Sequence, residues 1–209
     1  MKRHLSLSFV TGLCAIMCYL ALALLAFAHY PLPYSLLNNW LSDLGNPDLN
    51  PAGALFYNIG IVATAVLLPL FFLGLSRWKM ENNRIQRLML LITQGFGILG
   101  AIAMLISGLY PINSPALHGF FSACLYILLG TAFAFSVAAL RYHATCPRWL
   151  LIAGALTALV DMLYGVFHAV YMLEWVTTGM LLYYLGFLGA ETNQRSSATR
   201  GRTPMMAIR

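Results

Sequence analysis

The stretch LSLSFVTGLCAIMCYLALALLAFA, from Leu5 to Ala28, decides the class of the fold because it is a long, mostly apolar run without a charged side chain. A helix needs roughly 20 such residues to cross a bilayer. The run is also too long for the apolar part of a signal peptide, which spans about 7 to 15 residues. We therefore interpret it as an uncleaved first membrane helix.

Five further apolar runs follow and use nearly all of the remaining chain. With 60% hydrophobic and 9% charged residues, the composition is far from that of a soluble domain. The predicted fold class is all-α: a polytopic membrane protein with six transmembrane helices in one domain, residues 1–190, followed by a flexible basic tail, residues 191–209. The predicted spans cover approximately residues 6–28, 51–75, 88–110, 116–140, 149–170 and 172–190.

All twelve Lys and Arg residues lie in four short stretches that an even number of crossings places on one side of the membrane. The positive-inside rule makes that side cytoplasmic, so both termini are expected inside and any chemistry is expected to open outward. Topogenesis and anionic lipid headgroups explain the net charge of +6, and nucleic acid is not an expected partner. The four cysteines suggest neither a disulfide framework nor a thiolate metal site.

The longest outer connection, residues 29–50, contains YSLLNNWLSDLG from Tyr34 to Gly45, in which Leu and Trp recur at helical spacing. This pattern predicts a short amphipathic helix at the membrane interface that ends at Gly45 and covers the outer mouth of the bundle. Asn50-Pro51 and Ser114-Pro115 are each expected to supply the N-cap and first residue of the helix that follows.

Polar residues in the last two spans are candidates for function. Asp161 lies near the middle of the fifth span, where a carboxylate is costly unless it is paired, solvated or protonated; a hydrogen bond to another helix is the structural alternative. Tyr164 and His168 follow at helical spacing, so the three side chains are expected on one pocket wall. Glu174 lies just across a tight turn from His168, where an acid also favours a helix start.

His118 lies in the first turn of the predicted fourth helix, where the positive helix end favours a neutral imidazole that accepts a proton or binds a metal. The structural alternative for His118 is a capping role. For Asn58, in the second span, the structural alternative is an interhelical hydrogen bond. The predicted catalytic residues are Asp43, His118, Asp161, His168 and Glu174, and the predicted substrate-pocket residues are Ser42, Asn58 and Tyr164. Metal and cofactor binding stay open.

Five motifs share an order and spacing along the chain: Ser42-Asp43-Leu44-Gly45, Asn58, Gly108-Leu109-Tyr110-Pro111, His118 and Glu174. In these motifs the chain resembles the domain-of-unknown-function 998 family of bacterial and archaeal membrane proteins. The resemblance implies a six-helix fold in a prokaryotic cell membrane and a polar cluster at its outer face, and it brings no established reaction. Asp161 and His168 are not part of it.

Four functions fit these observations. The first is a membrane-embedded hydrolase or transferase that acts on a lipid or other apolar substrate from the outer leaflet, by acid-base chemistry or with metal-activated water. The combination of Ser, Asp and His residues is similar to that of the intramembrane metal hydrolases related to alkaline ceramidase. The chain lacks their paired His-x-x-x-His motif, which argues against a zinc site of that kind. The second is a small proton-coupled transporter with Asp161 as the protonation site. The others are a bis-His haem protein using His118 and His168, and an accessory or assembly subunit. Membrane lipids are the expected partners, and a homo-oligomer stays open.

Overall fold

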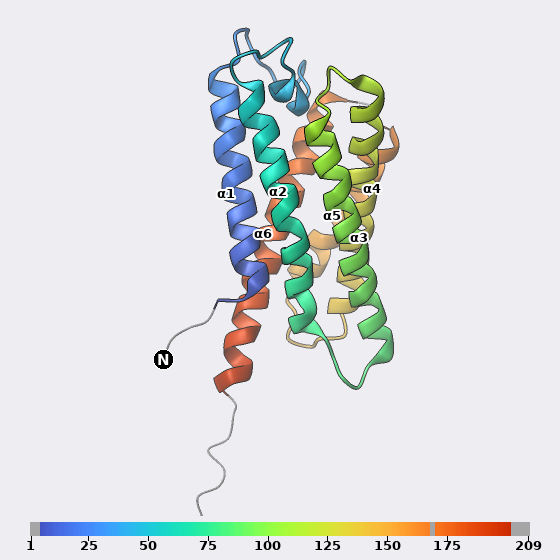
Figure 1. The fold of residues 1–209 in the computed structure, drawn as a ribbon. Helices are drawn as coiled ribbons and strands as arrows, with labels where there is room; N and C mark the ends of the chain where they lie inside the picture. Colours follow the sequence, from blue (N-terminus) through green and yellow to red (C-terminus); the bar gives the residue numbers. More distant parts are fainter. Residues whose placement is uncertain (1–4, 168–169, 202–209) are drawn as a thin grey trace, which may run out of the picture.

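The computed structural model describes residues 5–167 and 170–201, and within these ranges the chain forms six long α-helices, two short 3-10 helices and no strand (Figure 1). The all-helical fold class is therefore confirmed. In chain order the elements are α1 (Leu7–Ala28), η1 (Leu41–Gly45), α2 (Ala54–Gly74), η2 (Leu75–Trp78), α3 (Arg84–Leu109), α4 (Pro115–Leu140), α5 (Arg148–Phe167) and α6 (Tyr171–Gly201).

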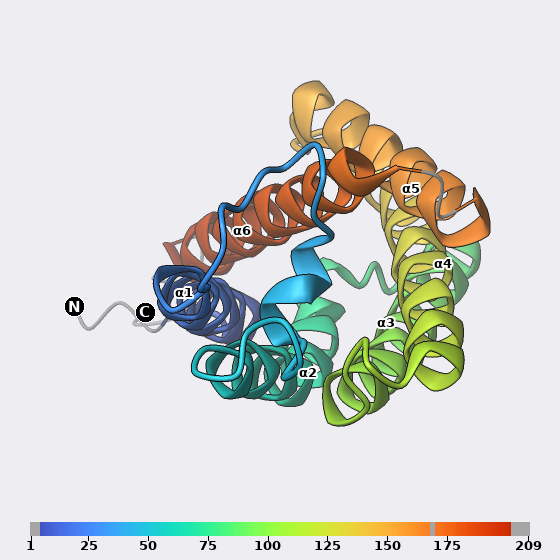
Figure 2. The ribbon, with the colours of Figure 1, turned by 90° about the horizontal axis from the view of Figure 1, so that it is seen from above.

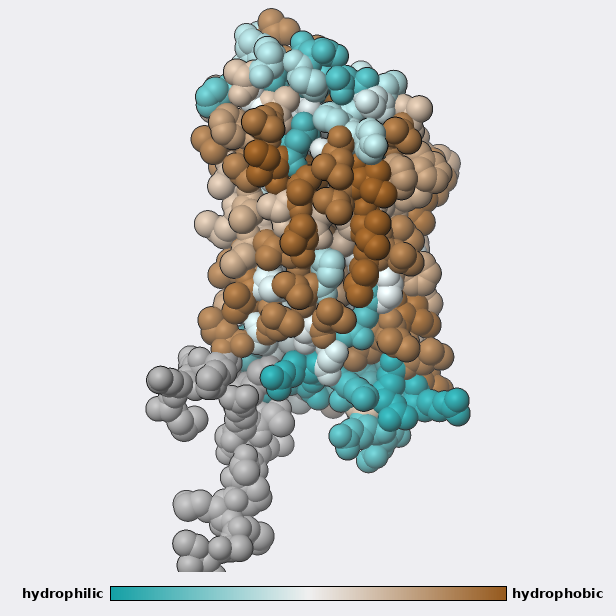
Figure 3. All heavy atoms as spheres, in the orientation of Figure 1, coloured by the Kyte–Doolittle hydropathy of each residue, from teal (hydrophilic) through white to brown (hydrophobic). Residues whose placement is uncertain are grey.

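Five of the helices, α1 to α5, are long and apolar enough to cross a membrane. On the face that Figure 3 shows, the side chains along the middle of the bundle are mostly apolar, and hydrophilic residues gather at both ends. This is the surface of a multi-pass membrane protein, because lipid contacts the apolar side chains and water contacts the ends. We name the end that carries η1 the outer end, and the opposite end the inner end.

The six helices form a ring when they are viewed along the bundle (Figure 2). Helices α1 to α5 each pack against the next one in the chain, and α6 closes the ring between α5 and α1. The backbone N–H of Ser6 donates a hydrogen bond of 2.9 Å to the side-chain oxygen of Asn193. The start of α1 and the C-terminal part of α6 therefore lie together at the inner end.

The start of α2 differs from the prediction, because the helix begins at Ala54 and not at Asn50-Pro51. Asn50 instead ties the outer loop together. Its side-chain oxygen accepts the N–H of Gly53 at 3.1 Å, and its amide donates to the carbonyls of Ala26 at 3.0 Å and Leu44 at 2.9 Å. The three bonds leave Asn50 fully buried and fix the loop to the outer end of α1.

Two other helix ends bear on the predictions. Helix α4 begins at Pro115, at the position that Ser114-Pro115 predicts. Helix α6 continues to Gly201, so residues 191–201 extend this helix where a flexible tail was expected. Residues 202–209 lie outside the described part of the chain.

The outer loop does not contain the predicted interfacial helix. Its regular part is the 3-10 helix η1, whose five residues are all buried and which lies over the middle of the ring (Figure 2). The Asp43 carboxylate accepts the Trp40 N–H at 2.9 Å, and the Glu174 carboxylate accepts the Leu41 N–H at 2.8 Å. Because these side chains satisfy the first amides of η1, the segment is stable as one short, buried turn.

Candidate functional site: a polar cavity beneath η1

A cavity of about 30 Å³ lies beneath η1, between the outer halves of α2, α3, α4 and α6. This volume holds about one water molecule. The cavity brings together two predicted catalytic residues, His118 and Glu174, and two predicted pocket residues, Ser42 and Asn58. The other polar residues that line it are Tyr57, Ser107, Ser122 and Tyr126.

Glu174 lies in the first turn of α6, and its side chain is only 6% exposed. One carboxylate oxygen accepts the backbone N–H of Leu41 at 2.8 Å, and the N–H of Ser42 lies 3.5 Å from the same atom. Glu174 therefore caps η1 from a distant part of the chain and presents an acid to the cavity.

The contacts of His118 determine its tautomer. Nδ1 lies 3.0 Å from the carbonyl oxygen of Tyr110 and 3.3 Å from that of Ser107. The Ser107 hydroxyl, which can accept as well as donate, also lies 3.3 Å from Nδ1. Because carbonyl oxygens only accept, the neutral tautomer that satisfies all three contacts has its hydrogen on Nδ1 and a lone pair on Nε2. Nε2 has no hydrogen-bond partner among the described residues. This is the tautomer that a general base requires.

Asn58 forms part of the cavity wall and also anchors η1. Its amide donates to the carbonyl of Gly45 at 2.9 Å. A Cβ atom at position 45 would collide with the Asn58 side chain and the Tyr57 ring. Glycine is therefore required here because the loop backbone lies directly against α2.

Asp43 does not line the cavity. Its side chain is 8% exposed, and it closes the first turn of η1 through the Trp40 N–H. Burial raises the pKa of Asp43 above its usual value because the charged form loses hydration. The structure gives this residue a capping role, and its catalytic role stays a prediction.

Asp161 also lies outside the cavity, deeper in the bundle between α4, α5 and α6. It is fully buried, and one of its oxygens accepts a hydrogen bond from the Thr177 hydroxyl. Its other oxygen, Oδ2, has no partner among the described residues. Gly130 of α4 packs against this side chain, since a Cβ at position 130 would lie 3.1 Å from that of Asp161.

Tyr164 lies just behind the cavity wall. It is 3% exposed, and its ring packs edge-on against the ring of Tyr126 with centroids 4.7 Å apart. His168, the third residue of the predicted pocket wall, lies outside the described residues. The bis-His haem alternative depends on this residue as well.

Four aromatic and hydroxyl residues that the sequence analysis missed form a wall beside the cavity. The hydroxyl groups of Tyr19 and Tyr57 are 3.4 Å apart, and those of Tyr126 and Thr178 are 3.1 Å apart. One signal was present in the sequence: His118, Ser122 and Tyr126 recur every four residues, which places them on one face of α4.

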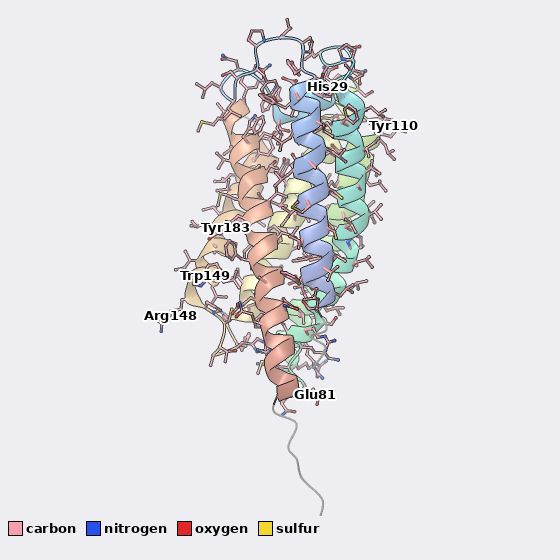
Figure 4. The ribbon with its side chains drawn as sticks, turned by 90° about the vertical axis from the view of Figure 1, so that its left-hand side faces the viewer. His29, Glu81, Tyr110, Arg148, Trp149 and Tyr183 are labelled. Atoms are coloured by element: carbon pink, nitrogen blue, oxygen red, sulfur yellow. The ribbon has the colours of Figure 1, made fainter. Side chains whose placement is uncertain are left out.

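An apolar groove of about 430 Å³ lies on the other side of this wall, between the outer halves of α1 and α6. Figure 4 views the bundle from the side on which these two helices lie. Tyr19 and Thr178 belong to the groove lining, and Leu41 and Leu44 of η1 border it. Leu24 at its edge is 65% exposed, so the groove opens sideways toward the lipid.

These features define a class: a multi-pass helical membrane protein with a polar cavity at one end and a lateral apolar groove beside it. Among the described residues, no three His, Cys, Asp or Glu side chains are grouped so that they could hold a metal ion.

Within that class, the chain belongs to the family described as Protein of unknown function (DUF998), whose model matches residues 13–191. The resemblance inferred from the outer-face motifs is confirmed. Neither a curated protein nor a solved structure matches the chain.

Proposed function

We propose that α6 is a sixth span and that the outer end faces away from the cytoplasm of a prokaryotic cell. Support comes from the basic residues of the inner end, where the Arg195 guanidinium lies 4.7 Å from the centroid of the Trp78 ring, and from the positive-inside rule. Asp48→Cys and Glu81→Cys, both at exposed positions, test the orientation in a cysteine-free background. A membrane-impermeant maleimide added to intact spheroplasts should label only the first; labelling of only the second would reverse the orientation.

For the activity, we propose a membrane-embedded hydrolase or transferase that acts on a lipid entering sideways from the outer leaflet. One arrangement carries this proposal. His118, with Nε2 unprotonated, and Glu174 share a small cavity, and a wall of hydroxyl groups separates that cavity from the lipid-facing groove. A base near a carboxylate suits acid-base catalysis, and the groove suits a hydrocarbon chain.

The residues have distinct roles in this proposal. His118 Nε2 takes the proton of a water molecule, or of an acceptor hydroxyl in a transferase, while that oxygen bonds to the acyl carbon of the lipid. The bond from the acyl carbon to the leaving oxygen then breaks, and the imidazolium returns the proton to that oxygen. The Glu174 carboxylate stabilises the imidazolium, and the hydroxyls of Tyr57 and Tyr126 are donors for the developing negative charge.

The proposal requires η1 to move during the reaction. Leu41 and Leu44 of η1 border the groove, and Ser42 between them lines the cavity. Displacement of η1 therefore joins the two spaces and frees the Glu174 carboxylate from the Leu41 and Ser42 amides. A lipid headgroup can then reach His118 while its chain stays in the groove.

The test is turnover of lipid extracted from cells that lack the protein, incubated with purified protein in nanodiscs and followed by mass spectrometry. The unmodified protein should consume one lipid class and form its product, and His118→Gln and Glu174→Gln should each lower this turnover by about 100-fold. The matched control is His29→Gln, which changes an exposed histidine of the outer end outside the cavity. An unchanged lipid profile with unmodified, folded protein would rule out the proposed activity.

Asp161 Oδ2, which has no partner in the part of the chain that the structure describes, favours one second candidate, a proton-coupled transporter. A carboxyl group that lacks a partner at this depth is a common protonation site in transporters. In proteoliposomes with an internal pH dye, Asp161→Asn should then abolish proton uptake, whereas Asp48→Asn at an exposed loop position should not. Equal uptake by both variants would exclude Asp161 as the coupling site.

A further inference from the structure

We infer that the groove between α1 and α6 binds the hydrocarbon chain of a lipid whose headgroup is uncharged. This inference rests on the proposed function, because it names the substrate class of the same site. It follows from the length and lining of the groove, from the aromatic residues at its mouth, and from the charges of the outer end.

The groove matches one leaflet in depth. Along α1 its lining runs from Tyr19 to Phe27, which is about 12 Å at the helical rise of 1.5 Å per residue. Half of a hydrocarbon core that is roughly 30 Å thick is about 15 Å. The groove volume of about 430 Å³ also lies within the range of small-molecule sites, which is about 300–1,000 Å³. A hydrocarbon chain lying parallel to α1 therefore fits it.

Aromatic residues at the outer mouth mark where the chain ends and the headgroup begins. The rings of Tyr34 and Trp175 meet edge to face with centroids 5.8 Å apart, and both residues line the groove. Their polar atoms bond to the loop above: the Tyr34 hydroxyl donates to the Trp40 carbonyl at 2.5 Å, and the Trp175 indole donates to the Asn39 carbonyl at 3.4 Å. Such side chains lie at the boundary between hydrocarbon and water. A headgroup above them adjoins η1.

The charges of the outer end disfavour an anionic headgroup. The sequence has no Lys or Arg between Arg3 and Arg77, between Arg87 and Arg141, or between Arg148 and Arg195, so the outer connections carry none. The acidic residues of the outer end are Asp43 and Asp48 in the loop and Glu174 in the first turn of α6. Phosphate groups are bound by Arg and Lys, and here a phosphate would meet carboxylates instead.

The carboxylates also disfavour a cationic headgroup. Asp43 and Glu174 are 8% and 6% exposed, and both already accept backbone N–H groups of η1. Bringing a cation to them removes its hydration as well, and that cost offsets the attraction. Hydroxyl and ester groups suit the hydroxyls of Tyr19, Tyr57 and Ser42, which both donate and accept hydrogen bonds. A neutral glyceride has this chemistry.

Brominated lipids test the inference because bromine quenches tryptophan fluorescence on contact, and Trp175 lines the groove. Protein in mild detergent is titrated with dibromostearoyl diacylglycerol or with dibromostearoyl phosphatidylglycerol. Trp175 also lines a second apolar groove, of about 460 Å³, between α5 and α6. Ala23 lines only the groove between α1 and α6, so the quenching that both Trp175→Phe and Ala23→Phe remove belongs to this site. The diacylglycerol concentration that gives half-maximal quenching should be at least about fivefold lower than the phosphatidylglycerol concentration that does so. The reason is that a like charge at contact distance costs about 1 kcal/mol in water.

Gly179 and Gly95 provide a matched pair of variants. Both are exposed helical glycines at which a Cβ would meet no atom within 4 Å, and only Gly179 lines the groove. Gly179→Phe should therefore remove both the site-specific quenching and the lipid turnover, and Gly95→Phe should leave both unchanged. Ala23→Phe fills the groove from the α1 side and should act like Gly179→Phe.

Each outcome separates the inference from the proposed function. Equal quenching by the two lipids, or a preference for phosphatidylglycerol, overturns the inference, whether or not a lipid is converted. Selective diacylglycerol quenching without conversion of any lipid supports the inference and counts against the enzyme. If neither lipid quenches Trp175, or if Gly179→Phe changes only the oligomeric state, the groove is covered by protein and the inference is wrong.

Discussion

The two ends of the bundle bury polar side chains in different ways. At the inner end, the indole of Trp78 donates to the Thr192 hydroxyl at 2.8 Å, and its carbonyl accepts from Gln86 at 2.9 Å and His143 at 2.8 Å. The Arg195 guanidinium covers the same ring. These contacts join η2, α3, the connection between α4 and α5, and α6, so the cluster is a structural clamp.

At the outer end, similar side chains surround a cavity, and some of their hydrogen-bonding capacity is left unused. Nε2 of His118 has no partner among the described residues, and Glu174 holds a loop that borders a groove. Buried polar groups that are fully partnered rigidify a fold, whereas an unused lone pair next to open space is available for a ligand. The ends differ most in the open space beside their polar side chains, because only the outer cluster borders the cavity and the groove. We therefore expect the inner end to serve stability and propose that the outer end serves chemistry.

The largest effect is expected from Trp78→Ala, which removes a side chain that is 2% exposed and central to the clamp. Loss of a buried Trp lowers the free energy of unfolding by about 3–5 kcal/mol. Chemical unfolding in detergent measures the change, and lipid turnover per folded molecule should stay the same. The control is Trp149→Ala, at an inner-end residue that is 45% exposed; an equally large loss there would contradict the clamp.

The next effect is on activity alone. His118→Gln should lower the initial rate of lipid turnover by about 100-fold, since loss of a general base costs 10²- to 10⁴-fold, with little change in unfolding free energy. His143→Gln at the inner end is the reciprocal variant, and it should lower stability and spare the rate. If both histidines affected stability and rate equally, the two ends would not be functionally distinct.

A smaller effect is expected on the pH dependence of stability, through His143 at the inner end. Burial, and then the nearby Arg195 charge, lower the pKa of His143 below its usual value of 6.5. The unfolded chain therefore binds a proton at a pH where the folded protein does not. The contribution of neutral His143 to the free energy of unfolding is intact above about pH 6.5 and is lost as the pH falls below that value. The melting temperature of the unmodified protein between pH 8 and pH 5 should fall more than that of His143→Gln. Parallel curves would rule out the effect.

The smallest effect is expected at Asp161, which belongs to neither cluster. Asp161→Asn keeps an oxygen that accepts the Thr177 hydroxyl and places no charge in the bundle. The free energy of unfolding should change by less than about 1 kcal/mol. Thr177→Val, which leaves the carboxyl group without this donor, should cost more. A large loss in Asp161→Asn would show that the carboxylate is needed in its ionised form.

The helices could be predicted because they depend on composition over long runs. Four of the predicted site residues, Ser42, Asn58, His118 and Glu174, were also found together, because each lies at the outer end of its segment and the alternation of spans determines that depth. The depth of a residue in the bundle does not determine which way its side chain points, however. Asp43 follows Ser42 directly, yet only Ser42 faces the cavity.

The outer loop was predicted less well because its structure depends on a residue far away in the chain. The periodicity of Leu and Trp favoured an amphipathic helix, whereas the Leu41 amide pairs with Glu174, 133 positions later. No local pattern contains that bond. The wall of Tyr19, Tyr57, Tyr126 and Thr178 was missed for a similar reason. Aromatic residues are common in membrane spans, and only the pairing of hydroxyl groups between helices distinguishes these four residues.

The hydrogen bond between Ser6 and Asn193 has a consequence for biogenesis. Helix α1 packs against α6, which follows it in the chain only after four other helices, so the ring closes only once α6 has been made. Until then, the flank of α1 that later faces α6 must be sheltered by lipid or by the insertion machinery. A chain that stops before Asn193 leaves the ring without this closing bond, which makes it a natural substrate for membrane quality-control proteases.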